Sequence, residues 1–286
     1  MISRLSQRQK GALLMCTSAL LFSSMQIAVN LTGGQIPLME QIFFRNVVSF
    51  ILCFVLIKKN GGSFFGKKKH QPLLILRSLF GFLGLVVMFY AAANGNQGDV
   101  TTLMKLSPFF ITILAAIFLK EKIPKVQFPA LILAFLGAAF VANPAFNSNM
   151  LPLFMALLCA LFSSVAYTLL AYFKNKVDGL AIVMHFSTFS ILATIPFMCM
   201  DFVLPSLHQL LLLLLIGIFG GLGQIAITYS YRMAPAGEVS IYNYSGIIFS
   251  ILLGNLFLGD SLAFNSLIGS GLVIIASILV YKLSPK

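Results

Sequence analysis

Lys105 is a cation in a run of otherwise apolar residues, in the stretch LMKLSPFF, and lies one turn before Pro108. A charge in an apolar segment is costly, and a proline inside a helix leaves an earlier carbonyl without its partner. Unpaired backbone at membrane depth is tolerated only beside protein or a water-filled cavity, and a hydroxyl such as that of Ser107 can satisfy part of it. We therefore expect this stretch to line a solvated pocket at a helix break.

Two arginines also lie inside apolar segments. Arg45 falls near the middle of 36–57, where a hydrogen-bond role between helices and contact with a substrate both stay open. Glu40 does not face it, because a spacing of five residues puts the two about 140° apart around a helix. Arg77 lies near the end of 71–93 that follows a basic loop, so we expect its long stem to carry the guanidinium to water.

The second half of the chain contains a matching polar stretch. A shift of 139 residues carries Lys105 onto Tyr244, in IYNYSGII, and Ser107 onto Gly246. We expect the two stretches to face each other around one central site, with Ser107, Pro108 and Gly246 at the helix breaks that gate it. Tyrosines there could stack on a ring or hold an amine by cation–π attraction. The candidate substrate-binding residues are Lys105, Arg45, Tyr90, Asn94, Tyr167, Tyr229, Asn243 and Tyr244.

The chain offers little that could serve an enzyme. It has seven carboxylates, and none forms an acid–base pair inside an apolar segment. It has no HExxH motif, no G-x-S-x-G motif and no phosphate-binding glycine loop. The four cysteines lie in apolar segments without a CxxC pair, which argues against disulfides and metal ligation. We therefore expect no enzyme activity, no catalytic residue, no metal and no cofactor.

Four carboxylates form two repeat-related pairs. Asp99 and Glu238 open two predicted helices, where a negative charge suits the positive helix end. Glu121 and Asp260 close the same two helices. We expect these last two to pair with loop cations or to accept hydrogen bonds from a neighbouring helix end.

The composition places the chain in a membrane. It is 59% hydrophobic and 9% charged, whereas soluble domains carry roughly a quarter charged residues. About twenty apolar residues cross the hydrocarbon core as a helix, and the connections between such segments are short. We expect an all-α integral membrane protein with ten transmembrane helices: 11–31, 36–57, 71–93, 98–119, 125–142, 150–172, 180–200, 208–231, 236–258 and 264–281.

The basic residues indicate the orientation of these segments. All cations except Arg45, Arg77 and Lys105 fall before the first segment or after segments two, four, six, eight and ten. The positive-inside rule then puts both termini in the cytoplasm. The same rule accounts for the net charge of +12 without a nucleic-acid partner. A cleaved signal peptide is the rival interpretation of the basic N-terminal arm, but its apolar region is usually shorter.

The chain contains an internal repeat. The 139-residue shift brings FGFLG at 80–84 onto FGGLG at 219–223, and a shift of 140 superimposes two copies of LFSS. Each half holds five segments, so the second begins on the opposite side of the membrane. We expect two inverted five-helix repeats, 1–142 and 150–286. Inverted repeats are typical of secondary transporters, because equivalent halves can exchange the side on which they close.

These features resemble the drug/metabolite transporter superfamily, and within it the EamA-type ten-helix carriers. The residues that carry the resemblance are Phe44-Arg45, Leu76-Arg77, Pro108 followed by IFLKE at 117–121, Leu136-Gly137 and the Gly269-Ser270-Gly271 run. The resemblance implies a carrier with a central cavity that moves small metabolites. The chain departs from many members at Gly246-Ile247, where they carry a proline. The stretch 71–122 is similar to carriers of S-adenosylmethionine, which gives one substrate option.

We therefore expect a secondary transporter in the cell inner (plasma) membrane, working by alternating access around a midplane cavity. Its substrate would be an amino acid, an organic anion or a nucleoside-like compound, since Lys105 and Arg45 favour an anionic group. A channel and a membrane-embedded enzyme are the alternatives. Glu40 and His185 are the groups that could couple a proton, although structural roles suit both equally well. The expected partners are the substrate and the lipid bilayer, and a homodimer stays open.

Overall fold

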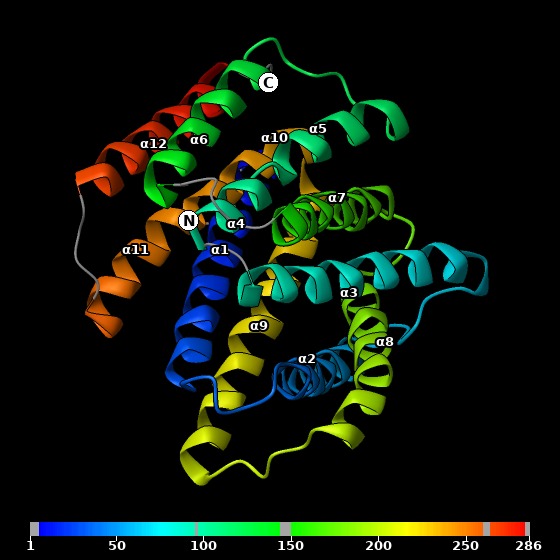
Figure 1. Ribbon diagram of the computed structural model, residues 1–286. Helices are drawn as coiled ribbons and strands as arrows, with labels where there is room; N and C mark the ends of the chain where they lie inside the picture. The colour runs from blue at the N-terminus through cyan, green and yellow to red at the C-terminus, as the bar shows by residue number, and fades with distance from the viewer. Residues whose placement is uncertain (1–5, 95–96, 144–149, 260–263, 284–286) are drawn as a thin grey trace.

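A computed structural model describes residues 6–94, 97–143, 150–259 and 264–283, and within these ranges every regular element is helical (Figure 1). The helices are α1 (Gln7–Leu31), α2 (Leu38–Asn60), η2 (Lys68–His70), α3 (Gln71–Asn94), α4 (Gln97–Met104), α5 (Ser107–Phe118), α6 (Gln127–Ala142), α7 (Met150–Tyr172), α8 (Gly179–Met200), α9 (Leu207–Met233), α10 (Ala236–Ser240), η3 (Ile241–Tyr244), α11 (Ser245–Leu258) and α12 (Phe264–Leu283).

The lengths and surfaces of these helices suit a bilayer. Seven helices of the described residues are long and apolar enough to cross a membrane, and three shorter apolar helices accompany them. Large apolar side chains lie on the outer surface, for example Phe118 and Leu256, each 71% exposed. A soluble protein rarely exposes extensive apolar surface. The prediction of an all-helical, multi-pass membrane protein is confirmed.

Polar side chains set where several helices begin. Ser6 and Gln9 form a capping box at the start of α1, and Ser206 and Gln209 form another at the start of α9. Asp178 caps α8, where its carboxylate accepts from the Leu180 amide at 2.9 Å. Each cap satisfies amides that have no partner within the helix. The two capping boxes fix the first residues of α1 and α9, and these two helices pack along each other.

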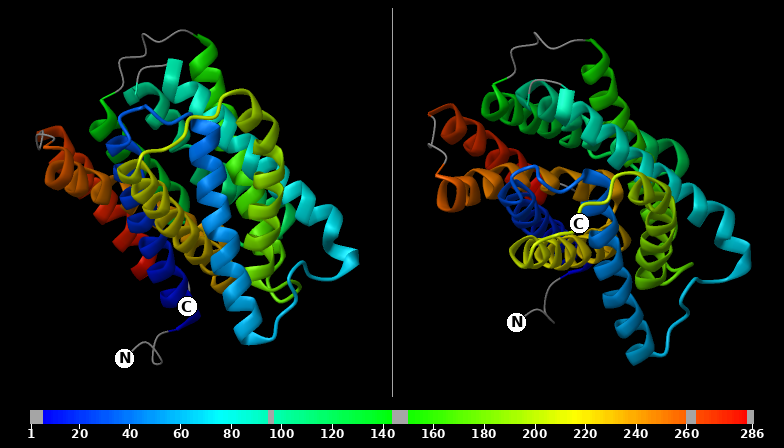
Figure 2. Two further views of the ribbon diagram at one scale, coloured as in Figure 1. Left: turned by 90° about the horizontal axis from the view of Figure 1, so that it is seen from below. Right: turned by 60° about the horizontal axis from the view of Figure 1, so that its bottom comes forward.

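The helices pack in pairs (Figures 1 and 2). α1 lies along α9, α3 along α7, α2 against α8, and α6 against α12. In the repeat register α1 corresponds to α7 and α9 to α3, so the first two contacts are equivalent. The α2–α8 and α6–α12 contacts each join a helix to its own counterpart.

Contacts between distant segments gather the basic connections at one end of the bundle. Glu121 accepts from the amides of Ala236 and Gly237, at 2.9 and 3.2 Å, as expected for a carboxylate beside a neighbouring helix end. Arg8 lies 3.6 Å from Glu238. Asp260, the predicted counterpart of Glu121, lies outside the described residues. Further contacts at this end join Arg232 to Phe173 and Val177, His70 to Phe173, and Gln9 to Tyr281.

Candidate functional site

The segment made of α4 and α5 is broken in its middle. α4 ends at Met104, α5 begins at Ser107, and Lys105 and Leu106 form a turn between them. The amides of Lys105 and Leu106 donate to carbonyls three residues back, each at 3.1 Å. Pro108 has no N–H to continue the α-helical ladder. The break therefore falls at the lysine.

The corresponding segment of the second half is also irregular. Between α10 and α11 the chain forms the 3₁₀ turn η3, a feature that often marks a hinge or strain inside a helix. The Tyr244 hydroxyl donates to the Lys105 carbonyl at 2.6 Å. Tyr244 and Lys105 correspond in the repeat register, so the two irregular stretches touch at equivalent positions. The bond also gives a partner to a carbonyl at the break.

Two serines tie the start of α5 to α7. The hydroxyls of Ser107 and Ser164 lie 3.1 Å apart, and the Ser164 hydroxyl is 3.0 Å from the Ser107 carbonyl oxygen. Both side chains are buried. The bonds supply the polar partners that a broken helix needs at this depth.

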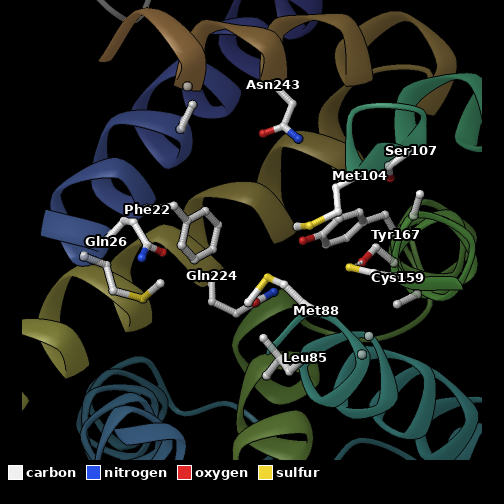
Figure 3. A pocket seen from close by; sticks show the side chains of 18 of the residues that line it. Phe22, Gln26, Leu85, Met88, Met104, Ser107, Cys159, Tyr167, Gln224 and Asn243 are labelled. Atoms are coloured by element: carbon white, nitrogen blue, oxygen red, sulfur yellow. Dashed lines mark hydrogen bonds between the residues drawn. The ribbon is translucent and has the colours of Figure 1, made fainter. Parts of the chain in front are cut away.

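A cavity of about 360 Å³ lies beside these stretches, within the range of about 300–1,000 Å³ for small-molecule sites. Figure 3 shows Phe22 from α1 and Tyr167 from α7 projecting into it from opposite sides, with the amides of Gln224 and Asn243 and the thioether of Met88. The wall is thus mainly apolar and aromatic, with a few polar groups directed inward.

Both halves of the chain contribute equivalent positions to the lining. Shifts of 139 or 140 residues relate many of the residues in contact with the cavity. The related pairs are Ala19 and Cys159, Ser23 and Ser163, Gln26 and Ala166, Arg77 and Ile216, Leu85 and Gln224, Met104 and Asn243, and Ser107 and Gly246.

Three cations line this cavity: Arg45, Arg77 and Lys105. Arg45 is 7% exposed and Arg77 is 2% exposed. The Nε and Nη1 atoms of both arginines are buried without a hydrogen-bond partner. Among the described lining residues there is no Asp or Glu. Buried charges are normally paired, so the arrangement favours an anionic ligand.

The expectation that Arg77 reaches water at the surface is wrong. Its guanidinium carbon lies 4.3 Å from the centroid of the Phe186 ring. Gly81, one helical turn further on, leaves room for this pair, because a Cβ there would lie 3.0 Å from the ring. The cation–π contact holds the side chain against α8 instead of letting it extend along the helix surface.

The structure divides the other predicted site residues into two groups. Tyr167, Asn243, Ser107, Pro108 and Gly246 line the cavity together with Lys105 and Arg45. Tyr90, Asn94, Tyr229 and Tyr244 are not among the lining residues.

Those four residues have other contacts. Tyr90 is 41% exposed, and the Asn94 amide donates to the Tyr90 carbonyl at 2.9 Å. The Tyr229 ring packs on Gly179, where a Cβ would lie 2.8 Å from its Cζ. Tyr244 is fully buried and reaches the Lys105 backbone. All four side chains therefore lie outside the described lining.

The two candidate proton-coupling residues also lie outside the described lining. Glu40 is buried, and its Oε2 accepts from the Val203 amide at 3.2 Å, at the end of the bundle away from the basic connections. His185 Nδ1 lies 2.9 Å from the Ser78 hydroxyl. Each has a structural partner.

Sequence reasoning missed Gln41 as well as Arg77. Gln41 lines the cavity, and its Nε2 donates to the Ile36 carbonyl at 2.9 Å. A signal was present, because Gln41 precedes Arg45 by four residues and such pairs share one helix face. Phe22 and Met88 also line the cavity, but nothing distinguishes them in so apolar a sequence.

The cavity lies in the half of the bundle away from the basic connections. Its lining includes Val29 near the end of α1 and Gln41 near the start of α2. Toward the basic end, the Tyr167 ring stacks on Tyr231 at 5.3 Å between centroids and 18° between planes. Tyr231 and Tyr244 are fully buried there. These rings close the bundle on that side.

Several known proteins that this chain resembles are transporters by name. The EamA-like transporter family matches residues 9–143 and again 150–282. A pseudopaline exporter of Pseudomonas aeruginosa is 30% identical over 96% of this chain and 96% of its own. An uncharacterized transporter of Helicobacter pylori is 26% identical over 94% of each chain. Solute carrier family 35 member G1 of Mus musculus is 26% identical over 82% of this chain and 68% of its own.

A solved crystal structure is similar to this fold. It superposes with a TM-score of 0.81 and 16% sequence identity, over 96% of this chain and 99% of that one.

Proposed function

The chain belongs to the EamA-like transporter family, and from this premise we propose that it is a secondary transporter that moves a small metabolite by alternating access. The named relatives are transporters, not enzymes. The observation that carries the proposal is the cavity, which draws equivalent side chains from both halves and contains unpaired cations.

The proposal includes ten crossings in two inverted repeats, 1–142 and 150–286. In it α4 with α5 forms one crossing, and α10, η3 and α11 together form its counterpart. Two observations support this arrangement: the family matches the chain twice, and the α1–α9 and α3–α7 contacts are equivalent. Equivalent halves of opposite orientation can exchange the side of the membrane on which they close.

The proposed orientation has both termini in the cytoplasm of a cell inner (plasma) membrane. The basic connections meet at one end of the bundle through the Arg8–Glu238 and Arg232–Phe173 contacts. An excess of Lys and Arg marks the cytoplasmic side. The cavity then lies toward the outer side, and the stacked Tyr167 and Tyr231 close it toward the cytoplasm.

The proposed substrate is a small metabolite with an anionic group, such as an amino acid, an organic anion or a nucleoside-like compound. The Arg45 and Arg77 guanidiniums supply unpaired donors, and the Tyr167 ring offers an aromatic face. The relative that exports pseudopaline makes export the direction to test first. S-adenosylmethionine uptake is a second option.

Counterflow in proteoliposomes tests the proposal. Liposomes loaded with one unlabelled metabolite of an anionic panel should accumulate the labelled compound saturably. Lys105→Gln should raise the half-saturation concentration about tenfold or more, because a charge-assisted hydrogen bond contributes about 1.5–3 kcal/mol. Lys122→Gln is the matched control, since Lys122 is an exposed loop cation. If no labelled metabolite of the panel accumulates by exchange in liposomes that contain folded protein, the transporter proposal fails.

The same assay separates a carrier from a channel. A carrier exchanges solute faster when substrate is present on both sides, whereas a channel gives flux that does not saturate. The Tyr167–Tyr231 stack across the inner side of the cavity favours the carrier, because a channel would need an open path on that side.

A further inference from the structure

The two halves of the cavity differ most in charge. Equivalent backbone positions line it from both repeats, but all three cations come from the first half. In the second half the corresponding positions are uncharged or weakly basic: His185 for Arg45, Ile216 for Arg77 and Tyr244 for Lys105. A symmetric scaffold therefore carries an asymmetric charge, and a substrate that fits it has its negative charge on one side.

Arg45 and Arg77 form a pair of like charges. Both side chains are buried, and both line the cavity together with Tyr167. Arg77 rests on the Phe186 ring. Arg45 packs against α9 at Gly220, where a Cβ would lie 2.7 Å from its Nε. Neither Phe186 nor Gly220 carries a charge that would neutralise the guanidinium it contacts.

The free donors of this pair suit one anionic group. The Nε and Nη1 atoms of both arginines are buried and unpartnered, and both residues line the cavity. A guanidinium presents its N–H groups in a planar fork that matches a carboxylate or phosphate. Two such forks around one anion would remove the repulsion between them and satisfy the donors together.

Lys105 provides a second, separate position. It lies on a different segment, at the break between α4 and α5. Arg45 and Arg77 instead contact α9 and α8, at Gly220 and at Phe186. No hydrogen bond of the Lys105 ammonium occurs among the described residues, although its carbonyl accepts from Tyr244. Lys105 and the two arginines therefore line the cavity from different segments.

We propose that the substrate carries two separate anionic groups, one bridging Arg45 and Arg77 and the other at Lys105. The amides of Gln224 and Asn243, which point into the cavity (Figure 3), contact the body between them. The inference rests on the transport function proposed above and narrows its substrate class. It disfavours a substrate of net positive charge such as S-adenosylmethionine, because three cations of the lining would repel it.

Cys159 makes the proposal measurable, because it lines the cavity (Figure 3). In a protein that keeps Cys159 and has Cys16, Cys53 and Cys199 replaced by Ser, bound ligand should slow its labelling by a maleimide. The probes are succinate, glutarate and adipate, each compared with its monoamide and its diamide. We expect one diacid to protect Cys159 at a concentration at least about tenfold below that of its monoamide, and the diamide not to protect.

Substitutions of the cations test whether each of the two positions binds one anionic group. Arg77→Gln should weaken protection by the preferred diacid about 30-fold or more while changing that by its monoamide less, because truncating one partner of a buried charge pair is costly. Lys105→Gln should also weaken protection by the preferred diacid about 30-fold or more while changing protection by its monoamide less. Lys122→Gln should leave protection unchanged. The diacid-to-monoamide ratio in the protein that keeps only Cys159 needs no substitution of a cation, so a folding failure of Arg77→Gln leaves the test intact.

The outcomes separate this inference from the transport proposal. Equal protection by diacid and monoamide, or no protection by any diacid, overturns the two-anion inference, even if proteoliposomes exchange another solute. Protection that follows the predicted charge dependence, without exchange of any diacid in proteoliposomes, keeps the inference and overturns the transport proposal.

Discussion

At the scale of single residues, the hydrogen bond from Tyr244 to the Lys105 carbonyl joins the two irregular stretches. It connects residues that correspond in the 139-residue repeat register, one from each half of the chain. Any movement that separates the two stretches must break it, which makes this pair a candidate latch between the states of the proposed carrier.

Removing the Tyr244 hydroxyl should destabilise the described state. In Tyr244→Phe the Lys105 carbonyl loses its partner at a partly buried position, which costs about 1–3 kcal/mol. Thermal unfolding of the purified protein should show this as a lower midpoint. Tyr281→Phe is the control, because its hydroxyl bonds to Gln9 at an exposed position. Equal midpoints for the Tyr244 variant and the wild type would contradict the latch.

At the scale of elements, close helix contacts depend on glycine. On α12, a Cβ at Gly269 would lie 2.6 Å from Cγ2 of Val141 and would also meet the Gly137 carbonyl oxygen. The backbones of α6 and α12 therefore approach as closely as small residues allow, which is how helices associate in membranes. Gly271, on the same helix, has open space around it, because a Cβ there would meet nothing within 4 Å.

The two glycines allow one substitution to be compared at two positions. Gly269→Ala should destabilise the protein by about 1–3 kcal/mol, because it overpacks the α6–α12 contact. Gly271→Ala should be neutral or stabilise by up to about 1 kcal/mol, because alanine favours the helix. Thermal unfolding of both variants in the same detergent measures the difference. Similar midpoints would show that the two helices are not held at this distance.

At the scale of the whole molecule, the basic connections gather at one end, and the contact between Glu40 and Val203 marks the other. The orientation proposed from this distribution predicts which surface faces the cytoplasm. Leu204 lies at the predicted outer end and is 83% exposed, whereas Lys122 is an exposed residue at the basic end.

Cysteines at these two positions test the orientation. In a protein without its native cysteines, Leu204→Cys should react with a membrane-impermeant maleimide in intact cells. Lys122→Cys should react only after permeabilisation, because the proposed orientation puts its loop in the cytoplasm. The reverse pattern would invert the proposed orientation, and labelling of both in intact cells would contradict the number of crossings between them.

The sequence by itself determined that this chain is a helical membrane protein of a transporter family. So few charged residues cannot cover a soluble surface, and the spacing of the apolar segments gives the helices. The helix break near Lys105 was also predictable, because it follows from the missing N–H of Pro108, a local property.

Only the tertiary structure decided which side chains meet in the cavity. It turned Arg77 inward onto Phe186 and placed Tyr90 and Tyr229 elsewhere. The physical reason is that lipid and protein interior are equally apolar. In a soluble helix the alternation of apolar and polar residues marks the face that packs inward, but in a membrane that contrast is lost. The rotation of each helix about its axis is then set by its neighbours.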